Sequence, residues 1–128
     1  MRVMHTMIRV RDLDESIRFY TERLGMKVFR RISESDGKSV AFIGYGDEGS
    51  HTVLELNHSP DKLQHVRGDF FGHIAIGVPN IESAFDALRE AGVKTLKPPR
   101  TKDGEVLASV EDPNGYKIEL IEDHGTLT

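Results

Sequence analysis

Two copies of one pattern constrain the fold of this chain more than any other feature of its sequence. A short strand-like run that opens with histidine, HTMIRV at 5–10, recurs as HIAIGV at 73–78. Each run precedes a segment whose apolar residues recur at helical spacing. A glycine follows each segment and can end the helix by adopting the left-handed conformation. Asp12 or Asp14 can cap the first helix, and Asn80 can cap the second. The predicted apolar stripes are Leu13, Ile17, Tyr20 and Leu24, before Gly25, and Ile81, Ala84, Phe85 and Leu88, before Gly92.

Three further strand-like runs follow the helix in each half, so each half is predicted to be a βαβββ module. The runs are KVFRRI, SVAFIGY and TVLEL in the first half and VKTLK, VLASVED and YKIEL in the second. The first module should cover about residues 1–57 and the second about 71–124, joined at about 58–70 by a linker or a short exposed helix. Because neither half is large enough to fold alone, we expect a single α+β domain of two tandem modules. Each module should have a curved mixed sheet covered by one main helix.

The composition excludes several classes of protein. The chain has 128 residues, a formal net charge of −4 and no cysteine, so it has no disulfide, no thiolate ligand and no general attraction to nucleic acid. No apolar run approaches the ~20 residues of a membrane span. The start, MRVMHTMIRV, lacks the apolar core of a signal peptide. We therefore expect a cytoplasmic protein that binds neither nucleic acid nor a membrane.

One histidine and one glutamate project from the non-core face of the strands in each half. Side chains alternate along a strand, so the apolar residues of HTMIRV, HIAIGV, VLEL and KIEL define the core face. His5 and Glu55 then lie on the other face of the first half, and His73 and Glu119 on that of the second. Taken singly, such residues are usually structural or solvated. The same pair in both halves, related by a pseudo-twofold axis, indicates a divalent metal site with positions left for water.

The segments around these four side chains resemble a known family. Over nearly its whole length the sequence is similar to bacterial glyoxalase I, or lactoylglutathione lyase, of the vicinal oxygen chelate superfamily. The resemblance rests on MRVMHTMIRVRDLDESIRFYTERLGMKV, AFIGYGDE, VLEL, FGHIAIGV and VEDPNGYKIELIE. It implies that His5, Glu55, His73 and Glu119 are the metal ligands, with Ni²⁺ or Co²⁺ favoured and Zn²⁺ possible. It also implies a homodimer whose sites form across the subunit interface.

The resemblance implies a reaction as well. Methylglyoxal combines with glutathione, the cosubstrate, into a hemithioacetal, which enzymes of this family isomerise to S-lactoylglutathione. Glu119 is expected to remove the proton from carbon 1, with Glu55 as its pseudo-symmetric partner, while the metal stabilises the enediolate. Arg9 lies on the strand face of His5, roughly 13 Å away at ~3.3 Å per residue, and matches the family's glutathione-binding arginine. Asn57, Ser59 and Lys102 are further candidates for contacts with the thiol.

Several alternatives stay open. Ser59 stands where relatives often carry an asparagine, and Asp69 where some carry a basic or neutral residue. The cosubstrate therefore stays open between glutathione and another low-molecular-weight thiol. An epimerase-like isomerase of the same superfamily would have glutamine at the position of Glu55. An extradiol dioxygenase would need an iron site of two histidines and one carboxylate. A binding protein of the bleomycin-resistance type usually lacks the metal ligands.

Overall fold

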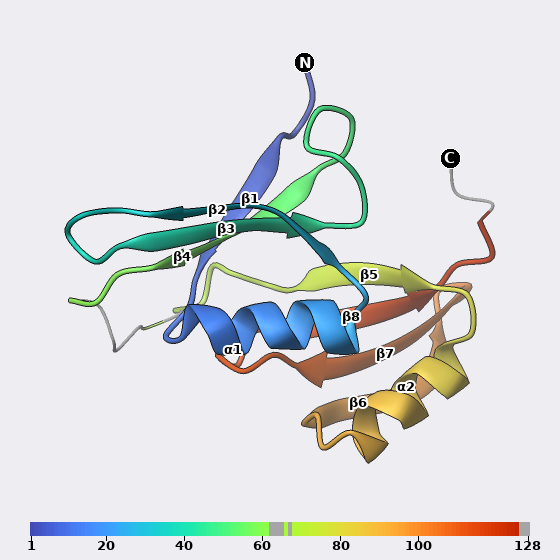
Figure 1. Ribbon diagram of the computed structural model, residues 1–128. Helices are drawn as coiled ribbons and strands as arrows, with labels where there is room; N and C mark the ends of the chain where they lie inside the picture. The colour runs from blue at the N-terminus through green and yellow to red at the C-terminus, as the bar shows by residue number, and fades with distance from the viewer. Residues whose placement is uncertain (62–65, 67, 126–128) are drawn as a thin grey trace. The chain divides into compact units, whose positions relative to one another are not determined.

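The computed structural model describes residues 1–61, 66 and 68–125, in two compact units, Met1–Val66 and Arg67–Thr128. Each unit is a four-stranded mixed sheet with one main helical segment (Figure 1). The predicted α+β fold of two βαβββ modules is therefore confirmed. The linker predicted at about 58–70 lies partly outside the described residues, so its conformation stays a prediction.

The first unit orders its strands so that the first and last are neighbours. Its elements are β1 (His5–Arg9), α1 (Leu13–Arg18), the π-helix η1 (Phe19–Arg23), β2 (Lys27–Ser33), β3 (Ser39–Gly44) and β4 (Val53–His58). The sheet order is β1-β4-β3-β2, in which β1 runs parallel to β4 and the other pairs are antiparallel. Parallel neighbours need a crossover connection, which the helix and the two intervening strands provide.

The second unit repeats this topology. Its elements are β5 (Ile74–Val78), α2 (Ile81–Glu90), β6 (Thr95–Lys102), β7 (Glu105–Glu111) and β8 (Lys117–Glu122). The order is β5-β8-β7-β6, with β5 parallel to β8. Helix α2 contacts β6, β7 and β8. None of the helices in the described ranges is long and apolar enough to span a membrane.

The first helical segment begins and ends where the sequence predicts, but its buried face differs. Asp12 caps it by accepting a hydrogen bond from the amide of Glu15, and Gly25 follows its end with φ of 71°. The predicted stripe assumed a regular α-helix, whereas the turn from Phe19 is a π-helix, which adds one residue to the turn. The residues that become buried are Leu13, Ser16, Phe19 and Tyr20, while Ile17 and Leu24 are only half-buried.

The second helix follows its predicted pattern closely. The Asn80 side chain accepts a hydrogen bond from the amide of Ser83 and caps the helix. Ile81, Phe85 and Leu88 are buried, and Ala84 is half-buried. The apolar residues of the sheet that complete the core of this unit include Ile76, Val110, Ile118 and Leu120.

Strand β6 extends five residues beyond its predicted end at Lys97, through Pro98 and Pro99 to Lys102. Proline is tolerated because β6 is an edge strand, where an amide is not needed for the ladder. The register to β7 shifts between Thr95 and Lys97 and again between Lys97 and Arg100. Such β-bulges change which residues share a face of the sheet.

We predict that Asn80→Ala lowers the free energy of unfolding by about 1 kcal/mol, because it removes the side-chain acceptor at the start of α2. Asn80→Asp keeps an acceptor oxygen and should stay close to the wild type. Urea unfolding followed by circular dichroism measures both variants. Equal stability of Asn80→Ala and the wild type would show that the cap contributes nothing.

Candidate metal centre

The first predicted pair of ligands meets on one face of the first sheet. Strands β1 and β4 are in a register that places Met7 opposite Glu55, and His5 lies two residues before Met7 on the same face. Nε2 of His5 lies 3.3 Å from Oε1 of Glu55. The imidazole is 42% exposed and the carboxylate 16% exposed, so the pair is accessible but not fully solvated.

The second pair has the same local geometry. The register of β5 and β8 places Ala75 opposite Glu119, with His73 two residues earlier. Nε2 of His73 lies 3.4 Å from Oε1 of Glu119, and the two side chains are 39% and 16% exposed. The distances and exposures of the two units therefore agree closely, as the internal repeat predicts.

These separations fit two donors that share one metal ion. Donors about 2.1 Å from a metal, separated by an angle between about 90° and 110°, lie about 3.0 to 3.4 Å apart. Imidazole nitrogen and carboxylate oxygen are ligands for divalent first-row metals. Over the described ranges, however, no group of three or more His, Asp or Glu side chains gathers in a way that could hold a metal. Each unit by itself thus provides two candidate ligands, which is half of the predicted set.

An aromatic and a basic side chain hold His5 in place in the first unit. The rings of His5 and Phe42 make an edge-to-face contact with 5.6 Å between centroids. The guanidinium of Arg30 lies 4.0 Å from the centroid of the Phe42 ring and forms a two-point ion pair with Glu48. The hydrogen bond with Glu48 raises the pKa of Arg30, which stays charged. Phe42 and Arg30 were not predicted from the sequence, because their place beside Glu55 depends on the strand register.

Two of the predicted substrate-binding residues are connected to Glu55. Nη1 of Arg9 donates a hydrogen bond of 3.0 Å to Oδ1 of Asn57, and Nδ2 of Asn57 donates one of 3.3 Å to Oε2 of Glu55. Asn57 therefore joins the candidate ligand to the candidate carboxylate-binding arginine. Ser59 is only 3% exposed in this structure.

The surroundings of Glu119 differ from those of Glu55. Phe42 of β3 pairs with Glu55 on the neighbouring strand β4, whereas Ser109 of β7 pairs with Glu119 on the neighbouring strand β8. Ser109 is 1% exposed. Lys102, the third further candidate for a contact with the thiol, is exposed and lies opposite Glu105 at the end of β6. A turn with positive φ at Asp103 and Gly104 follows it. Each unit therefore places the same His–Glu pair in a different environment.

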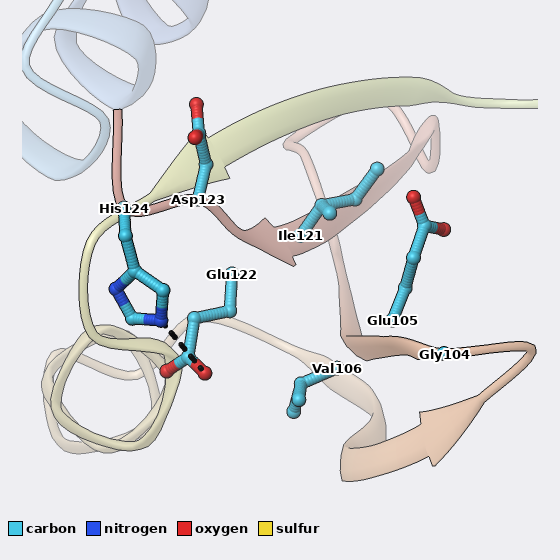
Figure 2. A pocket seen from close by; sticks show the side chains of 7 residues that line it. All are labelled: Gly104, Glu105, Val106, Ile121, Glu122, Asp123 and His124. Carbon is cyan, nitrogen blue, oxygen red and sulfur yellow. Dashed lines mark ion pairs between the residues drawn. The ribbon is translucent and has the colours of Figure 1, made fainter. Parts of the chain in front are cut away.

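A pocket of about 240 Å³ lies near the ends of β7 and β8 and contains none of the predicted ligands (Figure 2). Its lining includes His124, whose Nε2 lies 3.7 Å from Oε2 of Glu122. Oε1 of Glu122 also accepts a hydrogen bond from the amide of Ile81 at the start of α2. Glu122 therefore has a structural role, and His124 is a surface residue, as its sequence context indicates.

The sequence of the chain matches a known superfamily over most of its length. Residues 2–120 match the model of the Glyoxalase/Bleomycin resistance protein/Dioxygenase superfamily, and the chain belongs to this superfamily. It is 46% identical over 125 residues to the probable lactoylglutathione lyase of Synechocystis sp., with 95% of each chain covered. It is 44% identical to the lactoylglutathione lyase of Escherichia coli O157:H7, covering 96% of this chain and 93% of that one.

Solved structures of glyoxalase I share the fold. The trypanothione-dependent glyoxalase I of Leishmania major is 44% identical with a TM-score of 0.85, covering 95% of this chain and 86% of that one. Glyoxalase I of Zea mays is 33% identical with a TM-score of 0.92, and the match covers 98% of this chain and 46% of that one. The resemblance to glyoxalase I that the sequence predicts is thus confirmed.

We predict that chelator-treated protein rebinds Ni²⁺ or Co²⁺ at about one ion per chain, and that His73→Ala weakens this binding more than about a hundredfold. Loss of a partner that merely orients a ligand costs about 10- to 100-fold, so loss of a ligand should cost more. Isothermal titration calorimetry measures the affinity. His124→Ala removes a histidine that also lies beside a glutamate and serves as the control. Unchanged metal binding after loss of both His5 and His73 would refute the assignment.

Proposed function

We propose that this chain is a metal-dependent lactoylglutathione lyase, which isomerises the hemithioacetal of methylglyoxal and glutathione to S-lactoylglutathione. The observation that carries the proposal is the pair of His–Glu contacts, 3.3 and 3.4 Å long, at equivalent places in the two units. The superfamily and the lactoylglutathione lyases among its relatives support the same activity.

His5, Glu55, His73 and Glu119 would together hold one divalent cation, for which Ni²⁺ or Co²⁺ is favoured over Zn²⁺. Two nitrogen and two oxygen donors suit such an ion and leave positions for water or substrate. When bound, the cation supplies Lewis-acid stabilisation of the negative charge that develops on the substrate oxygens. The ligands would come from both units, in a homodimer that completes each site across the subunit interface.

Glu119 is the better candidate for the base that removes the proton from carbon 1. Oε2 of Glu55 already accepts a hydrogen bond from Asn57. This hydrogen bond occupies Oε2 of Glu55 and holds the carboxylate toward Asn57. For Glu119, the only recorded contact of the carboxylate within the described ranges is that with His73. The proton held by Glu119 would then pass to carbon 2, directly or by way of Glu55, its pseudo-symmetric partner.

Arg9 would bind a carboxylate at the far end of the thiol cosubstrate. Its position, four residues beyond His5 on the strand, sets it roughly 13 Å from that ligand. The hydrogen bond to Asn57 orients the guanidinium on the sheet face that carries His5. Lys102 would add a second cation from its exposed position at the end of β6, and Asn57 would contact the same part of the thiol. Ser59 is the weakest candidate for such a contact because it is buried.

We predict that Glu119→Gln lowers kcat by about a hundred- to ten-thousandfold, because it removes the general base. Arg9→Ala should instead lower kcat/KM by about ten- to a hundredfold, the loss expected for one hydrogen bond to a charged group. The Ni²⁺-loaded variants are assayed by thioester formation from methylglyoxal and glutathione. Trypanothione and other low-molecular-weight thiols are assayed in parallel.

Activity of the wild type with another thiol and none with glutathione would preserve the chemistry and change the cosubstrate. No activity with any hemithioacetal, despite a bound metal, would contradict the proposed function and favour an epimerase-like alternative. Arg89→Ala, on the exposed side of α2, is the matched control for loss of an arginine.

A second prediction tests the proposed assembly. If each site combines one unit from each chain, mixing His5→Ala with Glu119→Gln chains should restore about a quarter of the wild-type activity, because hybrid dimers contain one intact site. Mixing His5→Ala with Glu55→Gln, both in the first unit, should restore none. Activity in neither mixture, or full activity of a monomer in size-exclusion chromatography, would contradict the shared site.

A further inference from the structure

Two buried polar atoms have no hydrogen-bond partner among the residues that the structure describes, and both lie in the second unit. They are Nη1 of Arg100 and Oγ of Ser109. Nearly all buried polar groups of native proteins are hydrogen-bonded, because leaving one unpaired is costly. These two atoms therefore indicate a site where an external polar group completes the bonding.

Both atoms belong to residues on the sheet face that carries Glu119. Ser109 of β7 lies directly opposite Glu119 of β8. Arg100 of β6 lies opposite Leu107, which is two residues from Ser109 on the same strand and so shares its face. Arg100 and Ser109 are thus diagonal neighbours, about 7 to 8 Å apart at Cα and within reach of a long side chain.

The position of Arg100 suits an extended ligand whose reacting end is at Glu119. Two strand spacings of about 4.8 Å and two residues of about 3.3 Å separate the two residues, which gives about 12 Å. This is close to the separation of roughly 13 Å between His5 and Arg9 in the first unit. Counted from the glutamate, Arg9 is nearer, at about 8 Å from Glu55, because it lies one strand spacing and two residues away.

The charge of Arg100 is also available, in contrast to that of Arg30 in the first unit, whose counterpart by strand register is Lys97, opposite Ser109. Arg30 occupies the row of Phe42 and Glu55, and its guanidinium is paired with Glu48. No ion pair of Arg100 with a carboxylate is found within the described ranges. Arginine binds carboxylates through two parallel hydrogen bonds, and the unpaired Nη1 of the half-buried Arg100 favours such a partner.

We propose that Arg100, assisted by Ser109, binds a carboxylate of the thiol cosubstrate on the Glu119 face of the second unit. The identity of the ligand rests on the proposed function, while the subsite rests on the two unpaired atoms. The Ser109 hydroxyl donates a hydrogen bond to the part of the ligand that lies between Glu119 and Arg100.

The test measures binding of S-methylglutathione, which cannot form a hemithioacetal, to the Ni²⁺-loaded full chain by isothermal titration calorimetry. Arg100→Ala should weaken binding by about ten- to a hundredfold, and Arg100→Lys by less, because the charge is kept. Ser109→Ala should weaken it by about two- to tenfold. Arg89→Ala, an exposed arginine of the same unit, should bind as the wild type does.

Two amide analogues of S-methylglutathione identify the carboxylate, one at the glycine end and one at the γ-glutamyl α-carboxyl. The wild type should bind one analogue about ten- to a hundredfold more weakly, and Arg100→Ala should then cause no further loss with that analogue. The wild type alone shows which carboxylate is bound, and Arg100→Lys, which keeps the charge, serves as the second variant if Arg100→Ala folds poorly.

The subsite is refuted if the wild type does not bind S-methylglutathione or if Arg100→Ala binds it as well as the wild type does. It is also refuted if Arg100→Ala weakens binding of the acid and of both amides by the same factor. These outcomes are independent of turnover. A protein that binds through Arg100 but leaves every hemithioacetal unconverted contradicts the proposed function alone. Conversion of the hemithioacetal with normal binding by Arg100→Ala contradicts the subsite alone.

Discussion

The parallel pairing of the first and last strands of each unit is the constraint on which the rest of the structure depends. It sets Met7 beside Glu55 and Ala75 beside Glu119, so the histidine two residues earlier falls next to the glutamate. A shift of the register by one residue would turn either glutamate toward the core. The helix between the paired strands covers apolar residues, which leaves the opposite face free for polar side chains.

The two units use this framework differently. Around Glu55 the sheet face is already occupied, because Asn57 donates to the carboxylate and Phe42 lies against His5. Around Glu119 the corresponding face carries Ser109 and, one diagonal step away, Arg100, both with unpaired buried atoms within the described ranges. The matching His–Glu pairs of the two units suit the proposed shared metal. The different surroundings of Glu55 and Glu119 suit different roles for these two carboxylates and a substrate whose two ends differ.

The sequence predicted the fold well where local rules decide the structure. Asn80 caps α2 and Gly25 follows the first helical segment with positive φ, as their residue types indicate. The prediction failed where packing overrides the local rule. The first helical segment buries Ser16 and Phe19 besides the predicted Leu13 and Tyr20, and its turn from Phe19 is π-helical, which neither spacing nor propensity predicts. The predicted strand ended at Lys97, yet β6 continues through Pro98 and Pro99, which its edge position accommodates.

By itself, the sequence determined the repeat, the two modules and the faces of His5, Glu55, His73 and Glu119, because alternation along a strand is a local property. Only the tertiary structure decided which residues surround them. Lys97 and Arg100 are three positions apart, so simple alternation would place them on opposite faces of β6. Because the register shifts between them, Lys97 pairs with Ser109 and Arg100 pairs with Leu107. Both of these β7 residues lie on the sheet face that carries Glu119. Strand pairing decides such a shift, because it depends on how the ladder of β6 and β7 accommodates an extra residue and not on the local sequence alone.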